Sequence, residues 1–584
     1  MPRPRFFVLL LCLAPLAGLI AAVAVYGVDV LRWDEWMVYG RMLERLDTGT
    51  FDLNSLIAQQ NEQRLASARI FGLAFISLAD LNRYVEFGFN IFLAGLLLVL
   101  VSVLFHRSSR RIGLKATWAY PMFALLAFSL AQWDGFFLGI NNTLHVPVLC
   151  LASAVLLMDN PRMGPGKFLV LAALCFAGSF HFANGLFLWF CILPMLMAMD
   201  TSKRAKMLYT GLWLVPAAGT WILYLANFQL PAHHPSIWSF FDQPLHCILY
   251  FFTYLGGPIF AGRESPLPAT AMGFWCFLFF VFNAWVLFTK NKETRRFLLP
   301  WLCLALFSLL SDGVTSVGRG GFPLSQALES RYVTFSTPFW YSLIALAAAA
   351  AMAAKKPLNL IMQSVQRMAL IIICISFSCS QLMSVLVLDF RSELHEKGRQ
   401  ELYSLQSARH ISRIFPDPDY LMTMLPRFFD HRLTVFRHIK YWDEYQLAED
   451  NGQILAGHLA SVVPNPVQLG KKGHAGLLLE GWAQDPATGN PAQWVLIVCQ
   501  GKIVYASDTG ITPPDNASGA SEDSGFSLFL PWFFFPDDSP NIEVFAVMDD
   551  GVTVRPLQID VDLPVRIPPR PEPEYTFERF FLST

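Results

Sequence analysis

Charge is scarce in this chain of 584 residues, where Asp, Glu, Lys and Arg make up 15% of the sequence against about 25% in typical soluble proteins. The 43 basic and 44 acidic residues leave a net charge of -1, so no overall positive field exists to hold nucleic acid. Apolar residues reach 54% instead. This balance excludes an ordinary soluble globule and a nucleic-acid partner, and it favours a lipid bilayer as the environment.

Cysteine and histidine patterns also exclude some chemistry. The ten cysteines form no CxxC pair and no metal-ligand spacing, and Cys499 is alone in the C-terminal region, which therefore has no internal disulfide. The pair His233-His234 lacks further ligands, which argues against a dedicated zinc site. No cofactor is assigned from the sequence, and a weakly bound divalent cation stays open.

Long apolar runs fill the chain up to residue 389. A helix of about 20 uncharged residues can cross the hydrocarbon core of a membrane. The sequence predicts eleven such spans, at about 6–26, 84–105, 116–132, 143–158, 168–181, 184–199, 207–226, 270–288, 297–311, 333–353 and 368–388. The first is interpreted as a retained anchor, because its apolar core is long for a cleaved signal peptide. Two further apolar stretches, 65–78 and about 248–260, are expected to be interfacial or re-entrant helices.

Basic residues set the orientation of these spans. One set of loops holds most Lys and Arg of the membrane part, whereas the opposite face, beyond the long first loop, holds only Arg263, Arg319 and Arg331. Because Lys and Arg accumulate in cytoplasmic loops, the first set is expected to be cytoplasmic. The first loop (27–83) and everything after the last span then face outward.

Ionisable side chains are absent from the middles of the predicted spans, where ion-coupled transporters usually place them, and no inverted repeat is visible. Both absences disfavour transport. The outward ends, in contrast, hold Asp34, Glu35, Glu62, Arg64, Arg69, Asp134, His145, His181, Asp242, Arg319, Glu329 and Arg331. Such one-sided chemistry suits one substrate anchored in the outer leaflet and another arriving from water.

The first outward loop begins with Trp33-Asp34-Glu35-Trp36. Successive helical residues diverge by about 100°, so Asp34 and Glu35 are not expected to enter the same site. A carboxylate half-shielded by tryptophans has a raised pKa and suits a general base. The alternative is an acidic capping pair in a solvated loop.

Two arginine-containing segments follow on the same side. Gln60-Asn61-Glu62-Gln63-Arg64 offers a carboxylate, amides and an arginine fork that matches sugar hydroxyls and a phosphate, although an internal Glu-Arg network is the alternative. The second segment, 312–321, is rich in glycine, is expected to be a loop, and precedes Glu329-Ser330-Arg331-Tyr332. Arg331 is expected at phosphate height, either holding a substrate or snorkelling to lipid headgroups.

Together these segments resemble the GT-C class of membrane glycosyltransferases, over roughly residues 1–440. The matching residues are Trp33-Asp34-Glu35-Trp36, Asn61-Glu62-Gln63-Arg64, His181-Phe182-Ala183-Asn184-Gly185-Leu186 and Ser330-Arg331-Tyr332. The resemblance implies transfer of a sugar from a polyprenyl phosphate to an envelope glycan or lipid, on the periplasmic face of a bacterial inner membrane, with inversion.

The same resemblance implies roles for individual residues. Asp34 is the first choice for the catalytic base and Glu35 the second. The donor phosphate and sugar would be bound by Arg331 with Tyr332, and by Glu62, Arg64, Arg319, His181 and Asn184. Related sequences often have a histidine where Gln63 stands, which puts any role of that histidine in doubt. His181 is as well explained as an interfacial histidine with its hydrogen bonds satisfied.

The chain is expected to divide into a GT-C-like membrane domain (1–390), a helical linker (391–465), a small antiparallel β-sandwich (466–565) and a tail (566–584). Hairpins are predicted around Gln500-Gly501 and Asp549-Asp550-Gly551. Trp482 is either a stacking platform for a glycan or part of the core. The apolar segment 531–536 should lean on the membrane or on the other domain.

Three functions compete at this point. The first is the glycosyltransferase, with a polyprenyl-linked sugar, a glycan or glycolipid acceptor and the bilayer as partners. The second is a flippase or other transporter of lipid-linked glycans. The third is a non-catalytic assembly protein whose β-domain recruits enzymes.

Overall fold

The computed structural model describes residues 4–229, 239–260, 265–353, 358–439, 455–464, 475–514, 517, 519–535 and 541–559, and it is mostly helical. His233-His234 and the tail 566–584 lie outside these residues. Eight helices in the described chain are long and apolar enough to cross a membrane. They are α1 (Pro4–Tyr26), α5 (Arg83–Ile112), α8 (Asn142–Met158), α11 (Lys203–Leu225), α14 (Leu267–Phe288), α15 (Lys292–Gly318), α16 (Ser330–Ala353) and α17 (Leu358–Ser404).

Eight of the eleven predicted spans fall on these long helices. The other three fall on shorter elements, which are α6 (Ala119–Ala127) with η1 (Leu130–Gln132), α9 (Pro165–Ser179), and η3 (Ala183–Phe187) with α10 (Leu188–Met197). In the first of these, the Ser129 hydroxyl accepts a hydrogen bond from the N–H of Ala131 and caps η1. The apolar run therefore does not form one continuous helix. The count of eleven therefore stays a prediction.

The stretches expected to be interfacial form the short helices α4 (Ala66–Ala79) and α13 (Pro244–Phe260). α13 packs so closely on α14 that a Cβ added at Gly273 would lie 1.9 Å from the carbonyl oxygen of Phe252. Gly256 has the same role, with the carbonyl oxygen of Ala269 at 2.1 Å from its added Cβ. Glycine is thus required at both positions where α13 meets α14, and the interfacial or re-entrant placement of α13 stays a prediction.

α15 differs from the sequence expectation. The glycine-rich segment from Asp312 was expected to be a loop, but the helix continues to Gly318 and includes Asp312 and Gly313. Asp312 and Ser316 are buried there, so tertiary packing outweighs the low helix propensity of glycine. The outward connection shortens to the residues between α15 and η4 (Leu324–Leu328).

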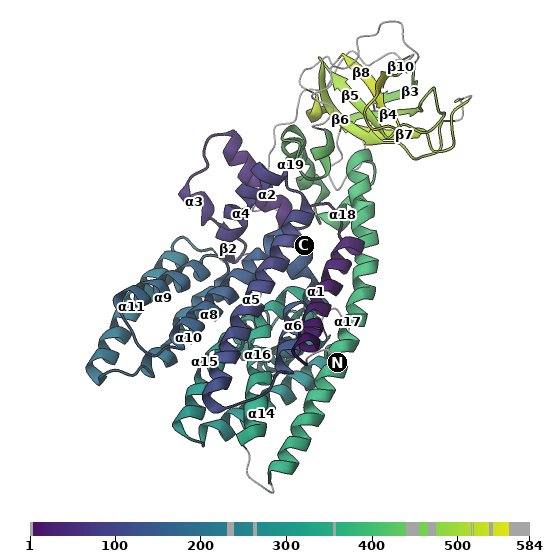
Figure 1. Cartoon of the computed structure of the whole chain (residues 1–584). Helices are drawn as coiled ribbons and strands as arrows, with labels where there is room; N and C mark the ends of the chain where they lie inside the picture. The colour runs from purple at the N-terminus through teal and green to yellow at the C-terminus, as the bar shows by residue number, and fades with distance from the viewer. Residues whose placement is uncertain are drawn as a thin grey trace.

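The elements of the first loop gather at the end of the bundle where the β-domain lies, as Figure 1 shows. They are α2 (Asp34–Asp47), α3 (Leu53–Leu56), β1 (Gln59–Gln60), β2 (Gln63–Arg64) and α4. The 47-residue helix α17, about 70 Å long, runs beside the bundle to the β-domain. Beyond it, α18 (Ala408–Ile414), α19 (Pro418–Asp430) and η5 (Thr434–Ile439) cover α2, with Phe428 packed edge-on against Trp36 at 4.9 Å.

The C-terminal region contains two four-stranded sheets, in the orders β10-β3-β4-β7 and β6-β5-β8-β9. The strands are β3 (Gly457–Pro464), β4 (Gly476–Ala483), β5 (Trp494–Cys499), β6 (Lys502–Asp508), β7 (Gly525–Pro531), β8 (Ile542–Val547), β9 (Val554–Pro556) and β10 (Gln558–Ile559). Both predicted hairpins are confirmed. Gln500 and Gly501 have φ of 52° and 74°, as the tight turn between β5 and β6 requires.

Three details of this region differ from the prediction. β3 begins at Gly457, before the expected boundary at 466, and β10 pairs parallel with β3 in a sheet expected to be antiparallel throughout. Trp482 lies half-buried on the face of β4 opposite the buried Leu477 and Leu479. It is therefore not a core residue, and its role as a glycan platform stays a prediction.

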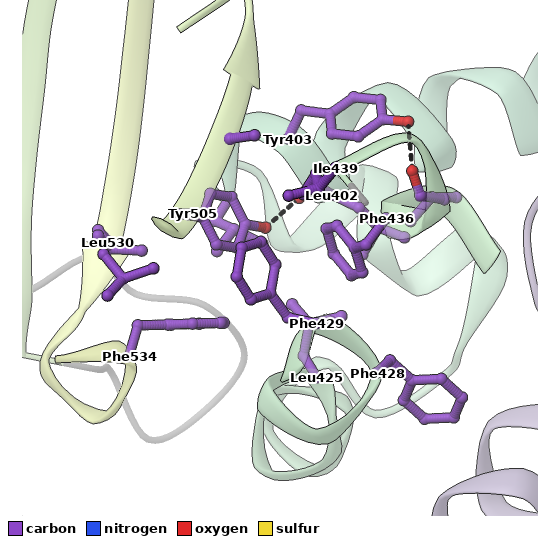
Figure 2. Close-up of a cluster of buried hydrophobic side chains, with 14 of the residues drawn as sticks. Leu402, Tyr403, Leu425, Phe428, Phe429, Phe436, Ile439, Tyr505, Leu530 and Phe534 are labelled. Carbon is purple, nitrogen blue, oxygen red and sulfur yellow. Dashed lines mark hydrogen bonds between the residues drawn. The ribbon is translucent and has the colours of Figure 1, made fainter. Parts of the chain in front are cut away.

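Aromatic side chains join the β-domain to the helices after the membrane part (Figure 2). The ring of Tyr505 on β6 stacks on Phe429 of α19 at 5.2 Å, and its hydroxyl donates to the carbonyl oxygen of Leu402 on α17. Phe534 packs against Tyr505 at 4.9 Å. Of the segment 531–536, which was expected to lean on the membrane or on the other domain, Phe534 thus contacts α19 through Phe429.

Removing the Phe429 ring should destabilise this junction. Phe429→Ala deletes a buried aromatic side chain and is expected to cost about 3–5 kcal/mol, measured as a lower midpoint of thermal unfolding in detergent. Phe390→Ala removes an exposed ring of α17 and should shift the midpoint little. Equal midpoints for the two variants would contradict a junction stabilised by Phe429.

Candidate active site

The N-terminus of α2 presents Asp34 and Glu35 with different surroundings. The residue before them, Trp33, has a φ of 51°, which is uncommon for a side chain of this size, and its N–H donates to the carbonyl oxygen of Ile414 at 2.8 Å. Such backbone strain is often found at functional sites. Here it sets the direction in which α2 starts.

Glu35 is completely buried, and both of its carboxylate oxygens are engaged. Oε1 accepts from the Arg83 guanidinium and from the N–H of Gly139 at 2.6 Å, and Oε2 accepts from the N–H of Arg32 at 2.8 Å. Arg83 also pairs with Glu86, which accepts a hydrogen bond from Tyr39. These contacts tie α2 to α5 and engage Glu35 in the interior, away from solvent.

Asp34 is half-buried and lies outside this network. Burial raises the pKa of its carboxyl group, the nearby Arg331 opposes that rise, and Glu62 adds to it. The nearby Asn61 side chain also acts to lower that pKa. Asp34 and Glu35 therefore diverge as the helix geometry predicts, and burial raises the pKa of the partly exposed Asp34.

The expected sugar-binding segment forms a two-stranded hairpin. β1 and β2 pair through Gln59 with Arg64 and Gln60 with Gln63, so Asn61 and Glu62 are the two turn residues. Asn61 has a φ of 50°, which asparagine tolerates better than most residues. The turn presents Glu62 to Arg319, and the two side chains form a partly exposed ion pair.

Arg64 does not share this position. Its guanidinium donates to three carbonyl oxygens, of Tyr224 at 2.9 Å, Ile57 at 2.7 Å and Ala226 at 2.7 Å. Arg69 likewise donates to the carbonyl oxygens of Leu56 and Ala58. Arg64 thus anchors the hairpin to the end of α11. The N–H groups that do so are ones that would have to bind a phosphate if Arg64 held one.

Arg331 stands at the start of α16 and is half-buried. It makes no hydrogen bond or ion pair within the described chain, although its Cζ lies 5.5 Å from the ring centroid of Tyr332. The Cζ of Arg319 lies 5.8 Å from the same centroid. Tyr332 thus has two guanidinium groups over its ring, and the hydrogen-bond donors of Arg331 are not used within the described chain.

Asp134 and Arg391 join the site without having been assigned to it from the sequence. Asp134 on α7 (Trp133–Phe137) is buried, which raises its pKa to about 6 against the opposing charge of Arg391. The Cζ of Arg391, on α17, lies 3.9 Å from the Trp133 ring centroid. The backbone N–H of Asp134 donates to Ser330 Oγ at 3.0 Å, which places Asp134 beside the start of α16.

His181 and Asn184 lie beside the hairpin, just before and within η3. Gln63 Oε1 accepts from the N–H of Ala183 at 2.6 Å, which links β2 to η3. Burial lowers the pKa of His181 to about 4, so its ring is neutral, and Nδ1 has no hydrogen-bond partner in the described chain. Both residues are half-buried and adjoin the hairpin, and His181 has no charge with which to hold a phosphate.

No family model, curated protein or solved structure matches this chain. The site must therefore be interpreted from its own residues. Within the described chain, no three His, Cys, Asp or Glu side chains lie close enough together to hold a metal ion. Asp34, Arg331 and the Glu62–Arg319 pair offer a partly exposed carboxylate and guanidinium groups beside an apolar bundle.

Proposed function

We propose that the protein is a GT-C-type membrane glycosyltransferase. It would transfer a sugar from a polyprenyl-phosphate donor to an envelope glycan or lipid on the periplasmic face of a bacterial inner membrane. The observation that supports this most is that the partly exposed Asp34 lies close enough to Arg331 to feel its charge, while Arg331 forms no ion pair in the described chain. A base and a phosphate-binding group are the two parts that such a transfer needs.

The reaction is a single displacement. The acceptor hydroxyl oxygen attacks the anomeric carbon, the bond between that carbon and the phosphate oxygen breaks, and polyprenyl phosphate leaves. Asp34 takes the proton of the hydroxyl, for which its raised pKa suits it. Arg331 donates to the departing phosphate, and the configuration at the anomeric carbon inverts.

The rest of the architecture is given a role in the same proposal. We take the membrane domain to have eleven spans, with α6, α9 and α10 in the three shorter ones. The two C-terminal sheets would be the halves of one sandwich, since their buried side chains belong to a single hydrophobic cluster. On this arrangement the sandwich and the C-terminus are periplasmic, beside the site.

The deciding experiment compares the envelope glycan composition of cells with and without the protein. We expect one sugar to be missing from the envelope glycan of cells without the protein and to return when the wild-type gene is restored. The purified protein should also transfer that sugar in vitro from the matching polyprenyl-phosphate donor. Unchanged composition together with absent transfer in vitro would contradict the proposal. A sugar that disappears from the periplasm but accumulates on lipid in the cytoplasmic leaflet would indicate a flippase instead.

Arg331→Gln should weaken donor binding specifically. Loss of a charge-assisted hydrogen bond to phosphate, about 1.5–3 kcal/mol, predicts a KM for the lipid-linked donor raised about 10- to 100-fold. Arg331→Lys should recover part of this loss, because it keeps the charge but not the planar fork. Initial rates at varied donor concentration measure both, and an unchanged donor KM in Arg331→Gln would rule out phosphate binding by this residue.

A further inference from the structure

Asp312 is a carboxylate in the interior of the helical bundle. It lies on α15, about two turns before the end of the helix at Gly318, and its side chain is completely buried. Neither carboxylate oxygen has a hydrogen-bond partner in the described chain, and no ion pair involves it. A charged group left unpaired in such a place is strongly unfavourable, and ionisable residues inside membrane domains mark binding sites by default.

The neighbouring helix α13 presents a second buried oxygen. Tyr254 is buried, and its hydroxyl has no hydrogen bond of normal geometry within the described chain. Among charged groups, Asp312 acts most strongly on this hydroxyl, and the hydroxyl of Thr315, one turn further along α15, is also close to it. Several buried oxygens that need partners therefore lie between α13 and α15.

The arginines nearest in sequence do not neutralise Asp312. Arg319, at the end of α15, pairs with Glu62. Arg331, on α16, lies over one side of Tyr332, whose ring stacks on Tyr254 at 4.7 Å. The ring of Tyr332 thus lies between Arg331 and Tyr254, and neither arginine forms an ion pair with Asp312.

We propose that Asp312 and Tyr254 bind a monovalent metal cation, such as Na⁺, between α13 and α15. Hard cations prefer oxygen ligands, and the two carboxylate oxygens and the hydroxyl supply three. A single carboxylate balances a single positive charge, and no cluster of acidic residues suited to a divalent ion exists in the described chain. A proton on Asp312 is the competing occupant, but it would satisfy fewer of these oxygens than a metal cation coordinated by all of them.

The bound cation would hold α13 against α15, so it should raise the stability of the full-length protein. Thermal unfolding of purified protein in detergent, followed by tryptophan fluorescence, is measured while NaCl or KCl replaces choline chloride at constant ionic strength. We expect the wild-type midpoint to rise saturably by several degrees. Asp312→Asn, which keeps the shape without the charge, should show no cation response.

Two further variants complete the experiment. Tyr254→Phe removes one ligand and should need about tenfold more cation for the same rise, which also tests the site if Asp312→Asn does not fold. Asp200→Asn changes an exposed carboxylate paired with Arg296 and should respond as wild type does. A wild-type midpoint indifferent to Na⁺ and K⁺, an equal response in Asp312→Asn, or a response to pH alone that Asp312→Asn removes would overturn the proposal.

Discussion

Asp34→Asn is expected to lower the rate of sugar transfer by about 10²- to 10⁴-fold while leaving the protein folded. Asparagine keeps the size of the side chain, but it cannot take the proton of the acceptor hydroxyl. Because Asp34 is half-buried and belongs to no buried ion pair, the exchange should cost little stability. Transfer from a polyprenyl-phosphate sugar to acceptor glycan, with the purified variant, measures the rate.

The pH profile gives a second sign of the same role. A base acts in its deprotonated form, so the wild-type rate should fall as pH is lowered through the pKa of Asp34. Since burial raises that pKa, the fall should begin at a higher pH than an ordinary aspartate would give. A rate independent of pH across the acidic range would argue against Asp34 as the base.

Two variants of the same helix separate catalysis from structure. Glu44→Gln alters an exposed carboxylate of α2 whose ion pair with Arg427 is 3.3 Å long, and it should keep full activity. Glu35→Gln should lose activity only in proportion to the folded protein that is lost, because Glu35 is buried and engaged. Full activity in Asp34→Asn would show that the assigned base is wrong.

The sequence predicted which polar residues lie near the site better than it predicted what each of them contacts. The divergence of Asp34 from Glu35 follows from helix geometry alone. Arg64 was expected at the phosphate, but its partners are backbone carbonyl oxygens at the end of α11, and no side-chain pattern marks those. Asp312 was placed in a loop because it ends the uncharged run 297–311, whereas packing keeps that segment helical.

Asp134 and Arg391 show a second limit. Arg391 follows the last apolar run, where the sequence suggests that the membrane helix stops. α17 instead continues to Ser404 and brings Arg391 onto the Trp133 ring. Only the fold unites residues from α7 and α17, so their local sequence gives no signal of the contact.

Arg83→Met is expected to destabilise the protein strongly. Arg83, Glu35 and Glu86 are fully buried, and the variant leaves two carboxylates without their cation. Removing one partner of a buried ion pair costs about 3–5 kcal/mol, since the desolvated charge that remains has no compensation. Chemical denaturation in detergent, followed by tryptophan fluorescence, measures the change in unfolding free energy.

The matched variant is Arg319→Met, which removes an arginine from the partly exposed pair with Glu62. Exposed ion pairs contribute about 0–1 kcal/mol, so the unfolding free energy should change little although donor binding weakens. Combining Arg83→Met with Glu35→Gln and Glu86→Gln should recover part of the loss, because neutral amides are cheaper to bury than unpaired carboxylates. If Arg83→Met were no less stable than Arg319→Met, the Glu35–Arg83–Glu86 network would not be what fixes α2, and with it Asp34, against α5.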